Sequence, residues 1–174
     1  RVFTKIWLAL FGQWDWRGVP VLPPELMLVP TWAPFNLYKF ASWARATIVP
    51  LLVLLAARPT HALGPDQALD DCYPAGRDEA DLRLPSRGRG LLSVERLFLM
   101  GDRVLRGLGR LPWKPLRGVA LRRAERWMLA HQEADGSWVR IQPPWVYSLM
   151  ALHQLGRPLD DPVMAKGLAG FRER

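Results

Sequence analysis

The stretch QEADGSWVRIQPPW, residues 132–145, decides the fold because it contains a helix end, a turn and a helix start. The segment before it, residues 121–131, consists of good helix formers with apolar side chains on one face, which predicts an amphipathic helix. That helix should end near Gln132. Asp135-Gly136 then predicts a turn, because glycine adopts positive φ without a steric penalty.

A second helix should follow this turn. Pro143-Pro144 suit its first turn, where the missing proline N–H costs no hydrogen bond, and we expect its body to run from Trp145 to Leu155. Gly156 is placed to end it. The two helices form a hairpin, and on composition alone Trp138 is equally well explained as an ordinary core residue of that hairpin.

The rest of the chain also consists of helical patterns broken by proline. Of its 174 residues, 49% are apolar and 16 are proline, which is typical of ordered, proline-punctuated helices. No strand pattern competes with the helical ones, so we expect an all-α protein. Pro50 should kink the longest helix. We predict a helical segment 1–62 containing a long helix 35–57, a surface loop 63–90 and a helical segment 91–174.

Basic residues are concentrated between residues 83 and 126. This stretch holds twelve Lys or Arg against three Asp or Glu, while the net charge of the whole chain is +8. Within it, residues 91–113 read as a basic amphipathic helix, which suits the surface of an anionic membrane. The solvated face of a core helix explains the pattern equally well. Nucleic-acid binding is not expected, because no nucleic-acid motif accompanies the charge.

Nothing in the sequence indicates a metal site, a disulfide or a membrane-spanning helix. The apolar run 48–57 is about half of the roughly 20 residues that a bilayer requires, so we expect a buried helix there. Cys72 is the single cysteine. The three histidines, His61, His131 and His153, lack metal-ligand spacing. We therefore expect no metal and no cofactor.

Three short segments carry recognisable motifs. Gln132, Gly136 and Trp138 follow the pattern Q-x3-G-x-W, and residues 141–145 read IQPPW. Residues 10–55 contain PPELML and FASWARAT. These segments resemble the squalene-hopene cyclases, which are class II triterpene cyclases. The resemblance implies helices of an α/α barrel, and we expect the chain to be an N-terminal part of a larger cyclase.

The resemblance also implies roles for individual residues. In the family, an aromatic residue of the S-W-A-R-A-T segment faces the substrate cavity, the IQP segment lines it, and the Q-x3-G-x-W residues are structural. Arg140 departs from the family pattern, which has a small residue there, often glycine. The implied cavity residues are Trp43, Ile141, Gln142, Pro143 and Tyr147, the channel residues Phe40 and Ile48, and the structural residues Gln132, Gly136 and Trp138.

Aromatic walls suit this chemistry, because polyene cyclisation moves a positive charge along a hydrocarbon. A desolvated cation over an aromatic ring gains about 2 kcal/mol. We interpret Trp7, Trp14, Trp16, Trp32 and Trp127 instead as core residues. The family's catalytic Asp-x-Asp-Asp acid is absent, since Ala68 and Pro158 precede the two Asp-Asp pairs. The chain thus contains no expected catalytic residue.

The family implies partners and a location for the full-length protein. We expect it to convert squalene to hopene and hopanol without a cofactor, as a homodimer attached to one face of the bacterial cytoplasmic membrane. Its membrane contact would include residues 91–113, and its C-terminal half would complete the cavity. The alternatives are a cyclase of another polyprene and a non-catalytic helical module that binds lipid or a partner protein.

Overall fold

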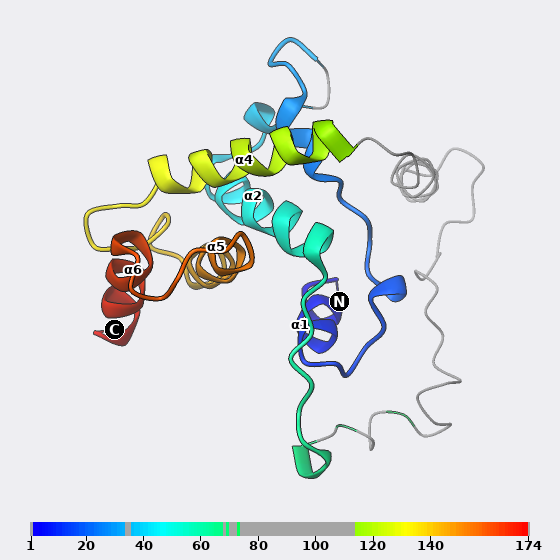
Figure 1. Ribbon diagram of the computed structural model, residues 1–174. Helices are drawn as coiled ribbons and strands as arrows, with labels where there is room; N and C mark the ends of the chain where they lie inside the picture. The colour runs from blue at the N-terminus through cyan, green and yellow to red at the C-terminus, as the bar shows by residue number, and fades with distance from the viewer. Residues whose placement is uncertain (1, 34–35, 68, 70–72, 74–113, 174) are drawn as a thin grey trace, which may run out of the picture. The chain divides into compact units, whose positions relative to one another are not determined.

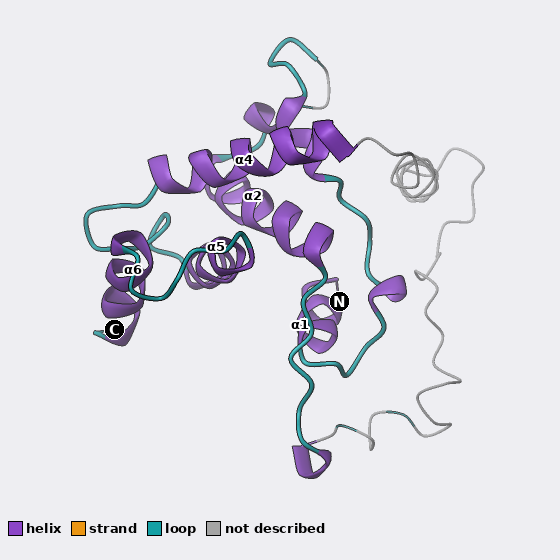
Figure 2. Ribbon diagram, viewed as in Figure 1, coloured by secondary structure: helices purple, strands orange, loops and turns teal. Residues whose placement is uncertain are grey.

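The computed structural model describes residues 2–33, 36–67, 69, 73 and 114–173, and this part of the chain contains helices and no strand (Figure 1, Figure 2). The prediction of an all-α protein is therefore confirmed. The predicted basic helix 91–113 and Cys72 lie outside the described residues. The α-helices are α1 (Val2–Leu10), α2 (Ser42–Ala57), α4 (Lys114–Ala130), α5 (Gln142–Gln154) and α6 (Pro162–Arg172); the 3-10 helices are η1 (Trp16–Gly18), η2 (Pro24–Leu28), η3 (Leu37–Lys39) and η4 (Pro65–Gln67).

The chain divides into two compact units by its contacts. The first combines Arg1–Val21 with Arg58–Arg110, and the second combines Leu22–Ala57 with Leu111–Arg174. Helix α2, which the sequence places in the predicted segment 1–62, belongs to the second unit because it packs against α4 and α5.

In the first unit, the chain that follows residue 57 returns to α1. The backbone N–H of His61 donates to the Leu10 carbonyl at 2.7 Å, and the Trp16 indole N–H donates to Thr60 Oγ1 at 3.1 Å. The side chain of Gln13 accepts from the backbone N–H of Leu69 at 2.9 Å. These bonds join segments that are about fifty residues apart in the sequence.

The core of the second unit is built on α2. From Val49 to Leu55 every residue of this helix is buried, Pro50 included. A helix that is apolar on all sides is typical of a protein interior. No helix among the described residues is both long and apolar enough to cross a membrane, and the run 48–57 lies in the buried helix that its length predicts.

One predicted helix starts in the wrong place. The sequence pattern predicts a helix over 35–57, whereas α2 begins at Ser42 and is preceded by η3. The cause is the buried amide of Asn36. It donates to the carbonyls of Thr31 and Ala33 and accepts from the N–H of Tyr38 at 2.9 Å, which holds a capped turn in place of a helix.

The signals at the two ends of α5 have the predicted effect, since Gly156 has φ +94° just after that helix. Asp161 accepts from the Val163 N–H at 2.9 Å as the N-cap of α6. Helix α5 begins at Gln142, with both prolines in its first turn. Helix α4 begins seven residues before the predicted start at residue 121.

Candidate functional site

The turn between α4 and α5 is pinned to α6 by the Gln132 side chain. Its Nε2 donates to the Gly136 carbonyl at 3.1 Å and to the Val163 carbonyl in α6 at 2.8 Å. Gly136 has φ +82°, and a Cβ added there would lie 2.8 Å from the Lys166 carbonyl carbon. Only glycine satisfies both the conformation and the close approach.

Trp138 connects this turn to the end of α4. Its side chain is fully buried, and its indole N–H donates to the Met128 carbonyl in the last turn of α4 at 2.8 Å. The same carbonyl accepts from the backbone N–H of His131 at 3.2 Å, so the indole adds a second hydrogen bond at the end of the helix. Gln132, Gly136 and Trp138 thus connect α4, the turn and α6.

The two residues that lead into α5 have a strained backbone. Val139 has φ +53° and Arg140 has φ +54°, values that glycine adopts without cost and other residues adopt rarely. The departure of Arg140 from the glycine of the family pattern therefore falls on a position with left-handed backbone. Its guanidinium lies 3.2 Å from Glu133 and 3.5 Å from Asp135.

Most of the predicted cavity residues are exposed at the starts of α2 and α5. Trp43 in the first turn of α2 is 59% exposed, and Ile141 just before α5 is 42% exposed. Gln142 and Pro143 are exposed as well. Tyr147 differs from them, since it is 1% exposed and lies in the interior of the unit.

The predicted channel residues flank Trp43. Phe40 is exposed, and Ile48 is half-buried on α2. Arg45 organises the backbone here: its Nη1 donates to the carbonyls of Phe40, at 2.9 Å, and Tyr38, at 3.2 Å. Arg45 is not among the predicted site residues, although it is part of the SWARAT motif.

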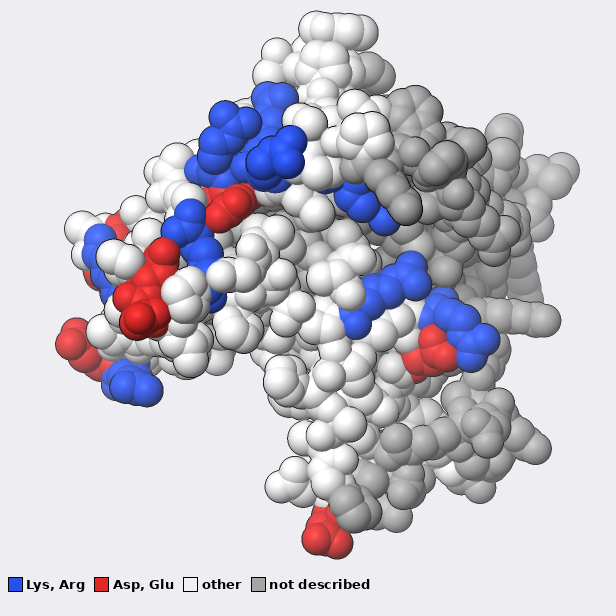
Figure 3. All heavy atoms as spheres, viewed as in Figure 1, with Lys and Arg blue, Asp and Glu red and all other residues white. Residues whose placement is uncertain are grey.

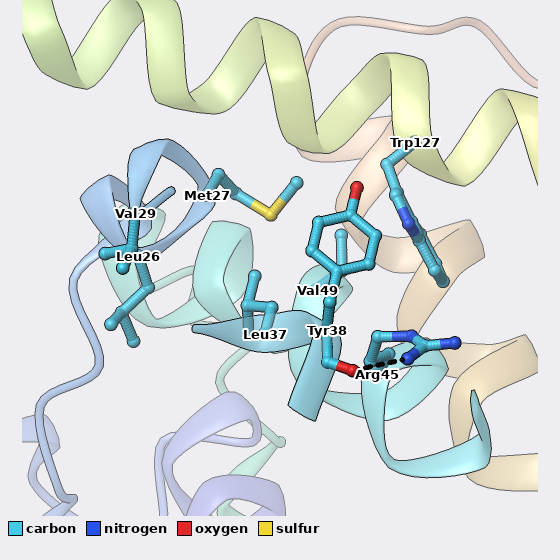
Figure 4. Close-up of a pocket in the computed structure, with 8 residues that line it drawn as sticks. All are labelled: Leu26, Met27, Val29, Leu37, Tyr38, Arg45, Val49 and Trp127. Atoms are coloured by element: carbon cyan, nitrogen blue, oxygen red, sulfur yellow. Dashed lines mark hydrogen bonds between the residues drawn. The ribbon is translucent and has the colours of Figure 1, made fainter. Parts of the chain in front are cut away.

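Two hollows border this region of the second unit. The smaller, of about 10 Å³, has room for about one water molecule. In Figure 4, Arg45 lies at its edge and bonds the Tyr38 carbonyl, while Tyr38 and Trp127 lie side by side. It is lined by Leu26, Met27, Val29, Leu37, Tyr38, Arg45, Val49 and Trp127.

The larger hollow, of about 320 Å³, lies between the start of α2 and the end of α4. It includes Gln132 and Trp138 but none of the predicted cavity or channel residues. Its lining includes Ser42, which precedes Trp43 in the sequence, and Val139, which precedes the start of α5. The lining residues are Ser42, Arg45, Ala46, Trp127, Ala130, His131, Gln132, Glu133, Trp138 and Val139.

The tryptophan side chains differ widely in their exposure to solvent. Trp32, interpreted from the sequence as core, is 83% exposed, which makes that interpretation wrong. Trp127 is half-buried and stacks on His131, with ring centroids 3.9 Å apart. Trp145, to which the sequence reading assigned no role, is 2% exposed and bonded to Gly167 in α6.

A helical unit with a Q-x3-G-x-W turn and exposed apolar side chains at the starts of α2 and α5 fits a terpenoid cyclase domain. The whole chain, residues 1–174, matches the squalene-hopene cyclase N-terminal domain, and it belongs to that family. The predicted family resemblance is confirmed.

The relatives of the chain are much longer proteins. It is 39% identical to a squalene-hopene cyclase of Alicyclobacillus acidocaldarius, over 98% of this chain and 26% of that protein. It is 38% identical to dammaradiene synthase of Dryopteris crassirhizoma, over 99% of this chain and 25% of the relative. A squalene-hopene cyclase of Bradyrhizobium diazoefficiens is 32% identical, over 95% of the chain and 25% of the relative. The chain thus spans about a quarter of each.

Proposed function

We propose that this chain is the N-terminal part of a triterpene cyclase that folds squalene and cyclises it to hopene and hopanol. The observation that carries the proposal is the exposure of Trp43 and Ile141 at the starts of α2 and α5. Large apolar side chains that remain exposed at helix starts mark a surface that another part of the protein or a ligand covers. Two curated relatives are named squalene-hopene cyclases, which supports the substrate.

The proposed role of these residues follows from the chemistry of a carbocation. Water or a lone pair would capture such a cation, so the cavity wall must be apolar and must still stabilise positive charge. The indole face of Trp43 does both, and a preorganised wall directs that stabilisation to the transition state. Ile141 and Pro143 exclude water. The proton that starts the reaction would come from the Asp-x-Asp-Asp acid in the remaining part of the enzyme.

Another polyprene is the second candidate substrate. A relative of nearly equal similarity is named dammaradiene synthase, so identity alone does not select the substrate or the product. Residues outside this chain would form most of the cavity wall and would therefore determine which polyprene is the substrate. The non-catalytic helical module is the less favoured alternative, because these relatives are named as cyclases and synthases.

The experiment replaces Trp43 by Ala in the full-length enzyme and compares products from squalene and from other polyprenes. We expect slower cyclisation and products released after fewer ring closures. The matched control is Trp32→Ala, which removes another exposed indole that lies outside α2 and α5. An enzyme with Trp43→Ala that keeps the wild-type rate and product pattern would remove the assigned role.

We further propose that the full-length enzyme is a homodimer attached to one face of the bacterial cytoplasmic membrane. The outer face of α4 supports a contact with anionic lipid. It exposes Arg122, Arg123 and Arg126, for which the structure describes no ion pair within its described ranges, and basic side chains gather over α4 in Figure 3. Leu116 and Val119 of the same helix are exposed as well. Arginine heads and short apolar side chains suit the boundary between headgroups and acyl chains.

Co-sedimentation with vesicles tests this contact. One full-length variant carries Glu at Arg96, Arg103 and Arg106 of the predicted helix 91–113, and a second carries Glu at the three α4 arginines. Both should bind anionic vesicles more weakly than the wild type and bind neutral vesicles equally. Undiminished binding by a variant would exclude its segment from the contact.

A further inference from the structure

The start of α5 is locked to α6 by the indole of Trp145. Its Nε1 donates to the Gly167 carbonyl at 3.0 Å, although Trp145 and Gly167 are 22 residues apart in the sequence. The ring of Phe171 meets the indole edge-on, with centroids 5.5 Å apart. Because Trp145 lies in the same helical turn as Gln142 and Pro143, this contact anchors the turn that carries them.

Two glycines of α6 make room for the indole. A Cβ on Gly170 would lie 3.2 Å from Cζ2 of Trp145 and would overlap the Asp135 carbonyl. A Cβ on Gly167 would lie 2.8 Å from Cδ2 of Leu149, one turn further along α5. Glycines three residues apart lie on one face of a helix. Helix α6 therefore presents a face without side chains to both α5 and the turn.

The same face of α6 receives the turn that ends α4. Gln132 bonds the Val163 carbonyl, and a Cβ on Gly136 would lie 3.2 Å from the Gly167 Cα. The end of α4, the glycine face of α6 and the first turn of α5 thus form one continuous contact. A substitution that displaces α6 should therefore also displace the start of α5.

We propose that Trp145, Gly167 and Gly170 are positioning residues that set where Gln142 and Pro143 stand in the cavity wall. This inference rests on the proposed function. The three residues do not touch substrate; they act by fixing the backbone of the first turn of α5. A displaced turn would leave the folded polyene misaligned and admit water to the cation, so the expected signature is a change in products and not only in stability.

The experiment uses the full-length enzyme with squalene as substrate and two independent variants. Trp145→Phe removes the indole N–H and keeps an aromatic ring, and Gly170→Ala adds the Cβ that meets Trp145 and Asp135. The control is Gly118→Ala in α4, where the added Cβ would meet only the Arg122 Nη1, at 3.5 Å. Product distribution, kcat, KM and thermal midpoint are measured for each.

We expect both variants to raise the share of incompletely cyclised products and to lower kcat about tenfold, within the roughly hundredfold that a 1 Å misplacement can cost. Gly118→Ala should retain the wild-type pattern. A lower thermal midpoint with unchanged products in Trp145→Phe would show a structural role and overturn the inference, whether or not Gly170→Ala folds. A wild-type enzyme that leaves squalene and other polyprenes unchanged would instead refute the proposed function.

Discussion

The indole nitrogen of Trp138 lies 2.8 Å from the carbonyl oxygen of Met128, ten residues earlier in the chain and in the last turn of α4. The turn therefore folds back on the helix it follows, and a side chain completes the hydrogen bonding of the helix end. The Q-x3-G-x-W spacing has a physical reason in this geometry, because Gln132 bonds the same turn to the Val163 carbonyl of α6.

Replacing Trp138 by Phe should lower the free energy of unfolding by about 2 kcal/mol, since it removes a buried hydrogen bond and leaves unfilled volume. Urea unfolding followed by circular dichroism measures the change. Trp32→Phe is the control, because that indole is 83% exposed and its replacement should change stability by less than about 0.5 kcal/mol. Equal effects of the two substitutions would contradict the capping role of Trp138.

Ser148→Ala should leave stability unchanged or raise it by about 1 kcal/mol. The Ser148 hydroxyl is buried in α5 with no hydrogen-bond partner in the described structure, so its removal relieves a desolvation cost. Ser137→Ala is the matched comparison, because that equally buried hydroxyl donates to Asp135 at 2.6 Å. It should destabilise the protein by about 1 kcal/mol. The two urea midpoints should move in opposite directions, or only that of Ser137→Ala should move.

Arg140→Gly should be more stable than Arg140→Ala by about 0.5 to 1 kcal/mol. Both variants lose the two exposed ion pairs, so those contributions cancel in the comparison. Alanine keeps the left-handed strain at φ +54°, whereas glycine relieves about 1 to 2 kcal/mol of it at an entropic cost of about 0.5 to 1 kcal/mol. Urea unfolding of the two variants measures the difference, and the prediction fails if alanine is as stable as glycine.

The pH dependence of stability should contain a contribution from Asp161. Partial burial raises the pKa of this carboxyl, but hydrogen bonds from the Val163 N–H and from Arg157 outweigh it and hold the pKa below its usual range. A lowered folded-state pKa means that the stabilisation is complete above the unfolded pKa and is lost as the pH falls through the folded pKa.

Asp161→Asn tests this contribution, because asparagine can cap α6 but cannot pair with Arg157. The difference in unfolding free energy between wild type and variant should be constant near neutral pH and should shrink below the ordinary pKa of 3.8. Asp160→Asn is the control, on an exposed neighbour for which the described structure gives no polar partner. A difference that persists at the lowest pH would exclude the ion pair as its source.

The signals that could be read from the sequence were those that act over a few residues. Asp161 caps α6 and Gly136 forms its turn because each is decided by the backbone within about four positions. The start of α2 was misjudged because the carbonyls that bind the buried Asn36 amide come from the preceding loop at Thr31 and Ala33. The hydrophobic periodicity of residues 35–57 contains no signal for those hydrogen bonds.

The same distinction between local sequence signals and tertiary packing applies to the candidate site. By itself, the sequence determined the helical class, the turn at Gly136, the end of α5 and the family motifs, since these depend on local spacing and residue type. Only the tertiary structure decided that Tyr147 is buried while Trp43 and Ile141 are exposed, and that two glycines of α6 receive Trp145. Burial and close approach depend on which distant segments meet, because a side chain loses its solvent only when another part of the chain packs against it.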